Sequence, residues 1–209
     1  GHSTNLSGVS NTLGLSANPL YVGGSNRRIT SNSPARRADS TGGDVGALPY
    51  LSDATPGLVG TLFTNQTLSG ANTVTGDLTV AAGVTVTLAP GTTLTFAGND
   101  QMQAGADVSK AELIVNGTLA STAAQTNPAV LTSSGTWVGV RILGGMGTSV
   151  SGLRISNAVN GIESLVTATV TDTQVLSATS SCFRVTSGTL NLSGSVGQGC
   201  GTYGLYSGS

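Results

Sequence analysis

Few side chains in this 209-residue chain are suited to chemistry, and their types limit the reactions that are open to it. The only histidine is His2, and the surrounding Gly1-His2-Ser3 is typical of an expression tag. Histidine triads, histidine metal sites and histidine acid–base catalysis are therefore excluded. Cys182 and Cys200 lack a partner base, so they are poor candidates for a nucleophile or a zinc site.

Carboxylate side chains provide two further candidate catalytic sites. Glycoside hydrolysis needs two carboxyl groups that face each other across a groove. Glu163 and Asp172 lie in regularly patterned sequence, but they belong to different predicted strands and no such pair recurs. A larger polar group, with the only lysine of the chain, gathers in one short stretch: Asn99, Asp100, Asp107, Lys110 and Glu112. A solvated loop that carries the few charges of the chain is the simpler interpretation of this stretch.

A repeat predicts the elements that position these residues. Four similar pieces follow one another at nearly constant spacing: Gly139–Ile142, Gly161–Ser164, Cys182–Val185 and Gly204–Ser207. Alternation within each piece predicts a strand, with Val140, Ile162, Phe183 and Leu205 stacked inward in one file. A period in the twenties is typical of a solenoid, in which each turn buries its apolar edge against its neighbours.

Further strands are predicted in the same turns. Ser149–Ser151, Thr169–Thr171 and Thr189–Asn191 recur at a constant interval, which predicts two short strands per turn in this region. Residues 74–96 alternate in three segments about eight residues apart, as one turn of a triangular coil would. Residues 97–110 break this rhythm and are predicted to form a loop. With 31 Gly and only 8% charged residues, the composition suits thin strands and tight corners, and no segment is predicted to be helical.

The chain also resembles a known family in two places. Gly83–Phe96, Leu113–Leu119, Asn127–Ser133 and Trp137–Val140 are similar, in order and spacing, to the opening of bacterial right-handed parallel β-helix proteins. Asn18–Val22, Ser31–Ala35 and Gly43–Ala47 resemble the closing coil of such helices. The resemblance implies an all-β fold, a right-handed parallel β-helix of the pectate-lyase-like type with about 20–24 residues per turn.

The two resemblances together imply a domain organisation. We expect residues 1–52 to be the closing coil of a preceding β-helical unit, with residues 1–3 a tag remnant and residues 53–60 a linker. Residues 61–209 would then form a second parallel β-helix, truncated at its C-terminal end because its last repeat has no polar cap. Neighbouring domains of a longer parent chain would flank this piece.

Two groups of side chains on the predicted outer surface each have a structural and a functional interpretation. Arg141, Glu163 and Arg184 alternate in sign, which favours ion pairs between turns of about 0–1 kcal/mol each. An acidic-ligand site formed by Arg141, Arg154 and Arg184 is the alternative, and Glu163 argues against it. The aromatic residues Trp137, Tyr203 and Tyr206 are candidate platforms for sugar rings, although Trp137 also suits a plug at the edge of a coil.

The cysteines suggest a compartment. By the repeat register, Cys200 lies shortly before Gly204, which stacks over Cys182. Neighbouring turns lie about 4.8 Å apart, within the roughly 4.4–6.8 Å between Cα atoms that a disulfide requires. We predict a Cys182–Cys200 disulfide, the alternative being two buried thiols. A disulfide implies export to a bacterial cell surface, periplasm or medium.

The favoured function is non-catalytic: a β-helical segment of a secreted or surface-anchored bacterial protein that serves as stalk, scaffold or adhesive surface. Its partner would be a polysaccharide or another surface protein, with no cofactor and no metal. A net charge of −1 gives no reason to expect nucleic acid, and no apolar span predicts membrane insertion by this segment. The alternative is a polysaccharide-binding or polysaccharide-lyase module. Lyases on this scaffold combine calcium-binding acids with a basic residue that takes a proton, groups that only the stretch from Asn99 to Glu112 offers.

Overall fold

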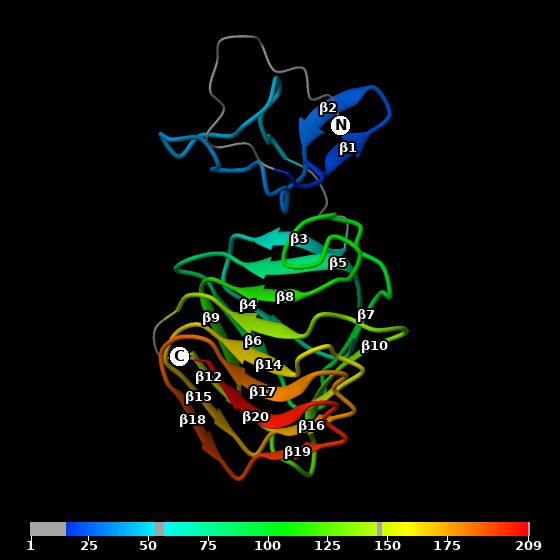
Figure 1. The fold of residues 1–209 in the computed structure, drawn as a ribbon. Helices are drawn as coiled ribbons and strands as arrows, with labels where there is room; N and C mark the ends of the chain where they lie inside the picture. The colour runs from blue at the N-terminus through cyan, green and yellow to red at the C-terminus, as the bar shows by residue number, and fades with distance from the viewer. Residues whose placement is uncertain (1–15, 53–56, 146–147, 209) are drawn as a thin grey trace.

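The computed structural model describes residues 16–52, 57–145 and 148–208, and in this part of the chain every regular element is a β-strand (Figure 1). A small antiparallel hairpin comes first, formed by β1 (Tyr21–Gly23) and β2 (Asn26–Ile29). All other strand pairs are parallel and lie on three faces that the chain visits in turn. The expected tag remnant and residues 53–56 of the expected linker lie outside the described residues, and the end of that linker is part of strand β3, which begins at Leu58.

We call the three rows of strands the first, second and third faces. The first face contains β3 (Leu58–Leu62), β5 (Ala71–Val80), β8 (Leu113–Val115), β11 (Val140–Ile142), β14 (Ile162–Ser164), β17 (Ser181–Val185) and β20 (Tyr203–Ser207). The second face contains β4 (Gln66–Leu68), β6 (Thr85–Leu88), β9 (Thr118–Ser121), β12 (Thr148–Ser151), β15 (Ala168–Thr171) and β18 (Leu190–Ser193). The third face contains the start of β5, then β7 (Thr93–Phe96), β10 (Ala129–Ser133), β13 (Leu153–Ser156), β16 (Gln174–Leu176) and β19 (Val196–Gln198).

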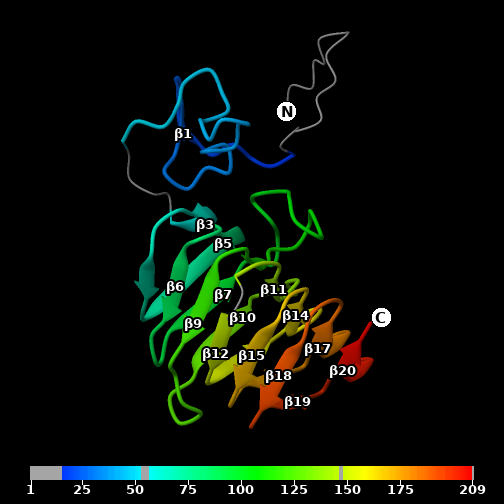
Figure 2. The same cartoon turned by 90° about the vertical axis from the view of Figure 1, so that its left-hand side faces the viewer.

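The long strand β5 joins two of these faces. Its first residues pair with β7 on the third face, and its last residues pair with β8 on the first face. The first and third faces are therefore one continuous hydrogen-bonded sheet, and the second face is a separate sheet of six strands. One passage through the three faces is a coil, and the coils lie side by side in parallel register, which gives a β-solenoid-like fold (Figure 2).

The register along the first face follows the file that the repeat predicts. Val140 pairs with Ile162, Ile162 with Phe183, and Phe183 with Leu205, so the near-constant spacing in the sequence is the length of one coil. The two coils that begin at Leu78 and at Leu113 are longer than the later ones, as the pairing of Leu113 with Leu78 and with Val140 shows. The expected length of about 20–24 residues per turn is therefore wrong for these two coils, where residues 97–112 and 122–128 are inserted between strands.

Two details of the predicted strands need correction. Each coil between β11 and β20 contains three strands rather than two, since β13, β16 and β19 form the third face. On the second face, Thr169 pairs with Asn191, so the third repeat is Asn191–Ser193 and not Thr189–Asn191. This shift is by an even number of positions, which leaves the inward and outward sides unchanged, and for this reason the alternation in the sequence does not reveal it.

The core fills the space between the faces. The inward file is buried at Leu113, Val140, Ile162 and Phe183, each at most 4% exposed. Leu205 keeps the register of the file but is 56% exposed, because no described residue lies on its outer side. The predicted plug is also inside: the Trp137 ring is fully buried and stacks on Phe96 with 4.1 Å between ring centres.

Residues 16–52, which we call the N-terminal segment, contact the first coil. The Asn32 carbonyl accepts a hydrogen bond from the Thr61 amide at 2.7 Å, and the Asn32 side chain donates to the Val59 carbonyl. Leu20, Val59 and Met102 form a small apolar cluster of their own. The N-terminal segment therefore covers the outer edge of β3, which would otherwise present unpaired backbone groups.

Candidate functional site

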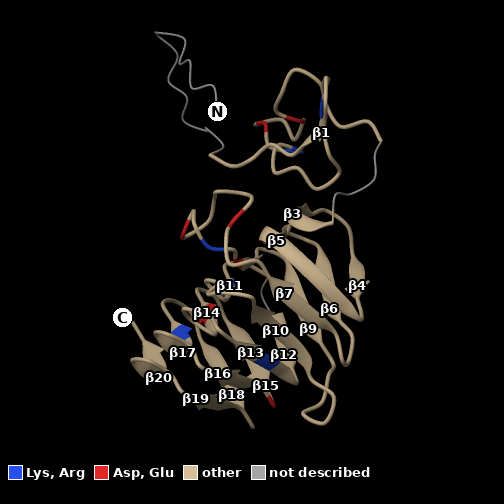
Figure 3. Cartoon of the chain, turned by 90° about the vertical axis from the view of Figure 1, so that its right-hand side faces the viewer, with Lys and Arg blue, Asp and Glu red and all other residues tan. Residues whose placement is uncertain are grey.

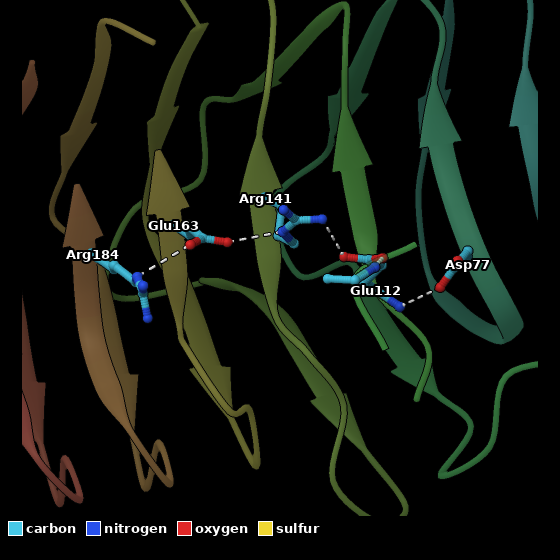
Figure 4. Close-up of polar contacts among 6 residues, drawn as sticks. Asp77, Glu112, Arg141, Glu163 and Arg184 are labelled. Atoms are coloured by element: carbon cyan, nitrogen blue, oxygen red, sulfur yellow. Dashed lines mark hydrogen bonds and ion pairs between the residues drawn. The ribbon is translucent and has the colours of Figure 1, made fainter. Parts of the chain in front are cut away.

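Most charged residues of the described part of the chain lie in the N-terminal segment, in the loop of residues 97–111 and along the first face (Figure 3). We call the row on the first face the charged ladder, and it consists of Asp77, Glu112, Arg141, Glu163 and Arg184 (Figure 4). The parallel register of β11, β14 and β17 places three of these side chains next to one another. The ladder thus brings together charged side chains that are far apart in the sequence.

Ion pairs connect neighbouring members of the charged ladder. Arg141 Nε donates to Glu163 Oε2 at 2.8 Å, and Arg141 Nη1 donates to Glu112 Oε2 at 3.1 Å. Arg184 Nε lies 3.2 Å from Glu163 Oε1. The predicted pairing of Arg141, Glu163 and Arg184 is thus confirmed. Burial opposes the charge of Arg141, but its hydrogen bonds to Glu163 and Glu112 outweigh this cost and raise its pKa.

The acidic end of the ladder is covered by the loop. Asp77, Asp100 and Glu112 are 3%, 6% and 0% exposed. Asp100 accepts hydrogen bonds from the backbone amides of Asp77, Met102 and Ala104 at 2.7–3.0 Å. These bonds fix the path of the loop over the outer side of β5 and β8.

The other two carboxylates at this end are also held by backbone amides. Glu112 Oε1 accepts from the Ala106 amide at 2.6 Å, and Asp77 Oδ1 accepts from the Glu112 amide at 2.9 Å. Burial, with the nearby charges of Asp100 and Glu112, raises the pKa of Asp77 from 3.8 to about 8. Burial also raises the pKa of Glu112.

The structure divides the predicted polar group of the loop into two parts. Asp100 and Glu112 are buried against the sheet, whereas Asp107 and Lys110 pair with each other at the exposed tip. The hydrogen bond from Lys110 lowers the pKa of Asp107 to about 2. Within the described residues, no three or more His, Cys, Asp or Glu side chains are grouped so that they could hold a metal ion. This arrangement anchors a loop and does not present its acids to a substrate.

The other predicted candidates are separated by the fold. Arg154 is exposed on β13, on the third face, and so it does not join Arg141 and Arg184 on the first. Trp137 donates its indole N–H to the Ser156 carbonyl at 2.9 Å from inside the core, which removes it as a sugar platform. Asp172 is exposed between β15 and β16, away from Glu163 on β14.

The last coil carries the disulfide and an open apolar surface. Cys182 and Cys200 form a disulfide with their Cα atoms 5.4 Å apart, which ties β17 to the turn before β20. Val196, Tyr203 and Leu205 are each about half exposed on this coil. The rings of Tyr203 and Tyr206 lie 5.4 Å apart, and the Arg184 guanidinium lies over the Tyr206 ring.

A cavity of about 470 Å³ lies between the N-terminal segment and the first coil. The Arg36 guanidinium lies 4.1 Å from the centre of the Tyr50 ring and 5.0 Å from that of the Phe63 ring. Asn32, Thr61 and Gln66 add polar groups to the lining. Two rings, a cation and several hydrogen-bonding groups are the components of a small polar ligand site.

Sequence reasoning missed Asp77 and the covered acidic end of the ladder. The sequence contained a weak signal for Asp77. It is the one charged residue in β5, and it stands directly before the inward Leu78. The cavity was also missed, because it joins Arg36 and Tyr50 to Phe63 across a contact that no local pattern predicts.

Comparison with known protein families, with curated proteins and with solved structures finds no match to this chain. The described residues contain no helix of the length and apolarity needed to cross a bilayer.

Proposed function

We propose that this chain is a right-handed parallel β-helical segment of a secreted or surface-anchored bacterial protein, and that it serves as a stalk, scaffold or adhesive surface. The observation that carries the proposal is the pairing of opposite charges along the first face. Arg141, Glu163 and Arg184 neutralise one another from coil to coil, and Glu112 completes the row. Side chains used in this way fix the register of coils and are not free to act as an acid or a base.

Two further features support a mechanical role. Backbone hydrogen bonds run from coil to coil on all three faces, so that each coil is held by its neighbours along its whole length. The Cys182–Cys200 disulfide adds a covalent link between β17 and the approach to β20. A disulfide is typical of proteins that function outside the reducing cytosol, which supports the proposed secreted or surface location.

A polysaccharide-binding module is the second candidate, and the cavity beside Arg36, Tyr50 and Phe63 favours it. Sugar rings place their apolar faces on aromatic side chains, and their hydroxyl groups suit the amides and hydroxyls of the lining. A lyase is less well supported, because Glu112 is fully buried and Lys110 is paired with Asp107.

The test is incubation of the protein with a panel of acidic and neutral glycans, with and without calcium. For a stalk or scaffold we expect neither cleavage nor binding, together with resistance of residues 57–208 to proteases under non-reducing conditions. Binding without cleavage, lost in Arg36→Gln, would favour the binding module instead. Cleavage that depends on calcium and on Lys110 would contradict the proposal and favour a lyase.

A further inference from the structure

The carboxyl groups of Asp77 and Glu112 both lie under the loop of residues 97–111. Both approach the same backbone position, because a Cβ atom built on Gly105 would collide with Glu112 Oε1 and lie 2.8 Å from Asp77 Oδ2. Gly105 also has a φ of +72°, a conformation that favours glycine. The loop therefore passes directly over the point where the two side chains meet.

The hydrogen bonds at this point leave one oxygen without a donor. Asp77 Oδ1 accepts from the Glu112 amide, and both oxygens of Glu112 also have donors, from Ala106 and Arg141. Asp77 Oδ2 is buried and, among the described residues, has no hydrogen-bond partner. A bare carboxylate oxygen in this position would be both desolvated and repelled by Glu112.

A proton on Asp77 Oδ2 resolves both problems, because the resulting hydroxyl can donate to Glu112 Oε1. We propose that Asp77 and Glu112 share one proton, and that this proton holds residues 97–111, and the N-terminal segment docked on them, against the first face. The shared proton turns a repulsive contact into a charge-assisted hydrogen bond. The raised pKa of Asp77, about 8, agrees with this assignment.

The surrounding charges favour a proton over a metal ion. The charged groups that face Asp77 are Asp100 from the loop, Glu112 from the approach to β8 and Arg141 from β11. Arg141 is already bonded to Glu112 and Glu163, and Asp100 already accepts hydrogen bonds from three amides. Asp77 Oδ2 is the one carboxyl oxygen here without a donor in the described part of the chain, which suits one proton but falls short of the roughly 6–8 oxygen ligands that calcium takes.

The N-terminal segment contacts the loop, so the protonation state of Asp77 and Glu112 also affects how this segment is held. The Asn18 amide donates to the Met102 carbonyl at 2.9 Å, and the Asn18 side chain donates to the Gln101 carbonyl at 3.2 Å. Leu20 packs with Met102 in the same place. Opening the loop therefore removes part of the surface on which the N-terminal segment lies.

The direction of the pH effect follows from linkage. Asp77 has a raised pKa in the closed state, so the open state, where the pKa returns towards 3.8, binds fewer protons between about pH 4 and 8. The closed state is thus most stable below pH 4, loses stability as the pH rises towards 8, and changes little above that value. Between pH 5 and 7 we expect opening of the loop to increase about tenfold per pH unit.

The experiment measures amide hydrogen exchange of the whole chain at pH 5, 6 and 7, after correction for the intrinsic pH dependence of exchange. Wild-type protein should lose protection about tenfold per unit in residues 97–111, with a parallel trend in residues 16–52. Asp77→Asn places an amide donor where Oδ2 lies, so it mimics the protonated state and should remove the slope. Asp172→Asn is the matched control, because it removes an exposed carboxylate where the φ of +49° tolerates asparagine, and it should keep the wild-type slope.

Three results would overturn the proposal. The first is protection of the wild-type loop that does not change with pH, and the second is a slope in Asp77→Asn equal to that of the wild type. The third is restoration of loop protection at pH 7 by added calcium, which would show that the pair binds a metal ion. If Asp77→Asn does not fold, the carboxyl ¹³C titration of wild-type Asp77 decides: a midpoint near pH 8 supports the shared proton, and one near pH 4 contradicts it.

Discussion

The outer sides of the first and last coils of this β-solenoid-like fold differ in how they are covered. At the first coil, the N-terminal segment covers β3 through backbone hydrogen bonds, an apolar cluster and the loop of residues 97–111. At the last coil, β20 has no described neighbour on its outer side, and Leu205 and Tyr203 are about half exposed. A disulfide ties this coil to the coil before it.

This comparison separates two requirements that a stack of coils has to meet. The first is register, which the backbone ladders supply along the whole first face and the Arg141–Glu163–Arg184 row supports across β11, β14 and β17. The second is burial of the apolar file, which needs cover on both sides of each coil. Leu205 is in register but is not buried on both sides. Residues of the same file therefore contribute very different amounts to the free energy of unfolding.

Matched leucine truncations should give the largest contrast. Leu113→Ala removes a side chain that is 1% exposed near the covered end, and we expect a loss of about 2–5 kcal/mol in the free energy of unfolding. Leu205→Ala, in the same file, removes a side chain that is 56% exposed and should cost about 1 kcal/mol or less. Chemical denaturation of both variants measures the difference. Equal losses would show that the last coil is covered in solution.

Removing the disulfide should affect only the last coils. Cys182→Ala with Cys200→Ala opens a loop with a sequence separation of 18, and the expected loss is about 3 kcal/mol. Hydrogen exchange should increase in residues 190–208 and stay unchanged in residues 16–52. Equal increases at both ends would mean that the ends unfold as one cooperative unit.

A pair of glycine variants tests how closely each end is packed. Gly60 has a φ of +78°, and a Cβ there would collide with the Asn32 carbonyl and lie 2.7 Å from Leu20 Cδ1. Gly60→Ala should therefore cost about 1–3 kcal/mol and release the N-terminal segment to proteases. Gly204→Ala, on the last coil, meets nothing within 4 Å and should change stability by less than about 0.5 kcal/mol. Similar losses would remove the distinction between a covered and an open end.

The exposed end of the charged ladder should give the smallest effect. The Arg184 side chain is 35% exposed, so Arg184→Gln should cost about 0–1 kcal/mol, and the loss should shrink further in high salt. Thermal denaturation at low and high salt measures this change. A larger loss that does not depend on salt would mean that Arg184 acts by packing on Tyr206, whose ring centre lies 5.0 Å from its guanidinium.

Sequence alone predicted the parallel, all-β character of the chain and the file of Val140, Ile162 and Phe183, because alternation and spacing report directly on register. The third strand of each coil was missed in the later repeats, since β16 and β19 are very short and show little alternation. The length of the coils that begin at Leu78 and at Leu113 was missed for a different reason. The loop at residues 97–110 was predicted from the break in the rhythm, but the expected length per turn was based on the later repeats, which contain no such insertion.

The candidate site was predictable only in part. Arg141, Glu163 and Arg184 lie at equivalent positions of one repeat, so their pairing follows from the register. The contact of Asp77 with Glu112 joins two side chains that are distant in the sequence, across an insertion that breaks the repeat. The loop buries both carboxyl groups, and this burial determines whether they are protonated. It results from tertiary packing, which no local sequence pattern predicts.

Spin-label distances along the first face test the stacking of coils most directly. Labels at Tyr206 and Ile114 span four strand-to-strand steps, and labels at Tyr206 and Thr79 span five. With neighbouring strands about 4.8 Å apart, stacked coils predict backbone separations of about 19 and 24 Å, measured by pulsed electron resonance. Two distances that fail to increase by about one strand spacing, as in two sheets packed face to face, would contradict the account.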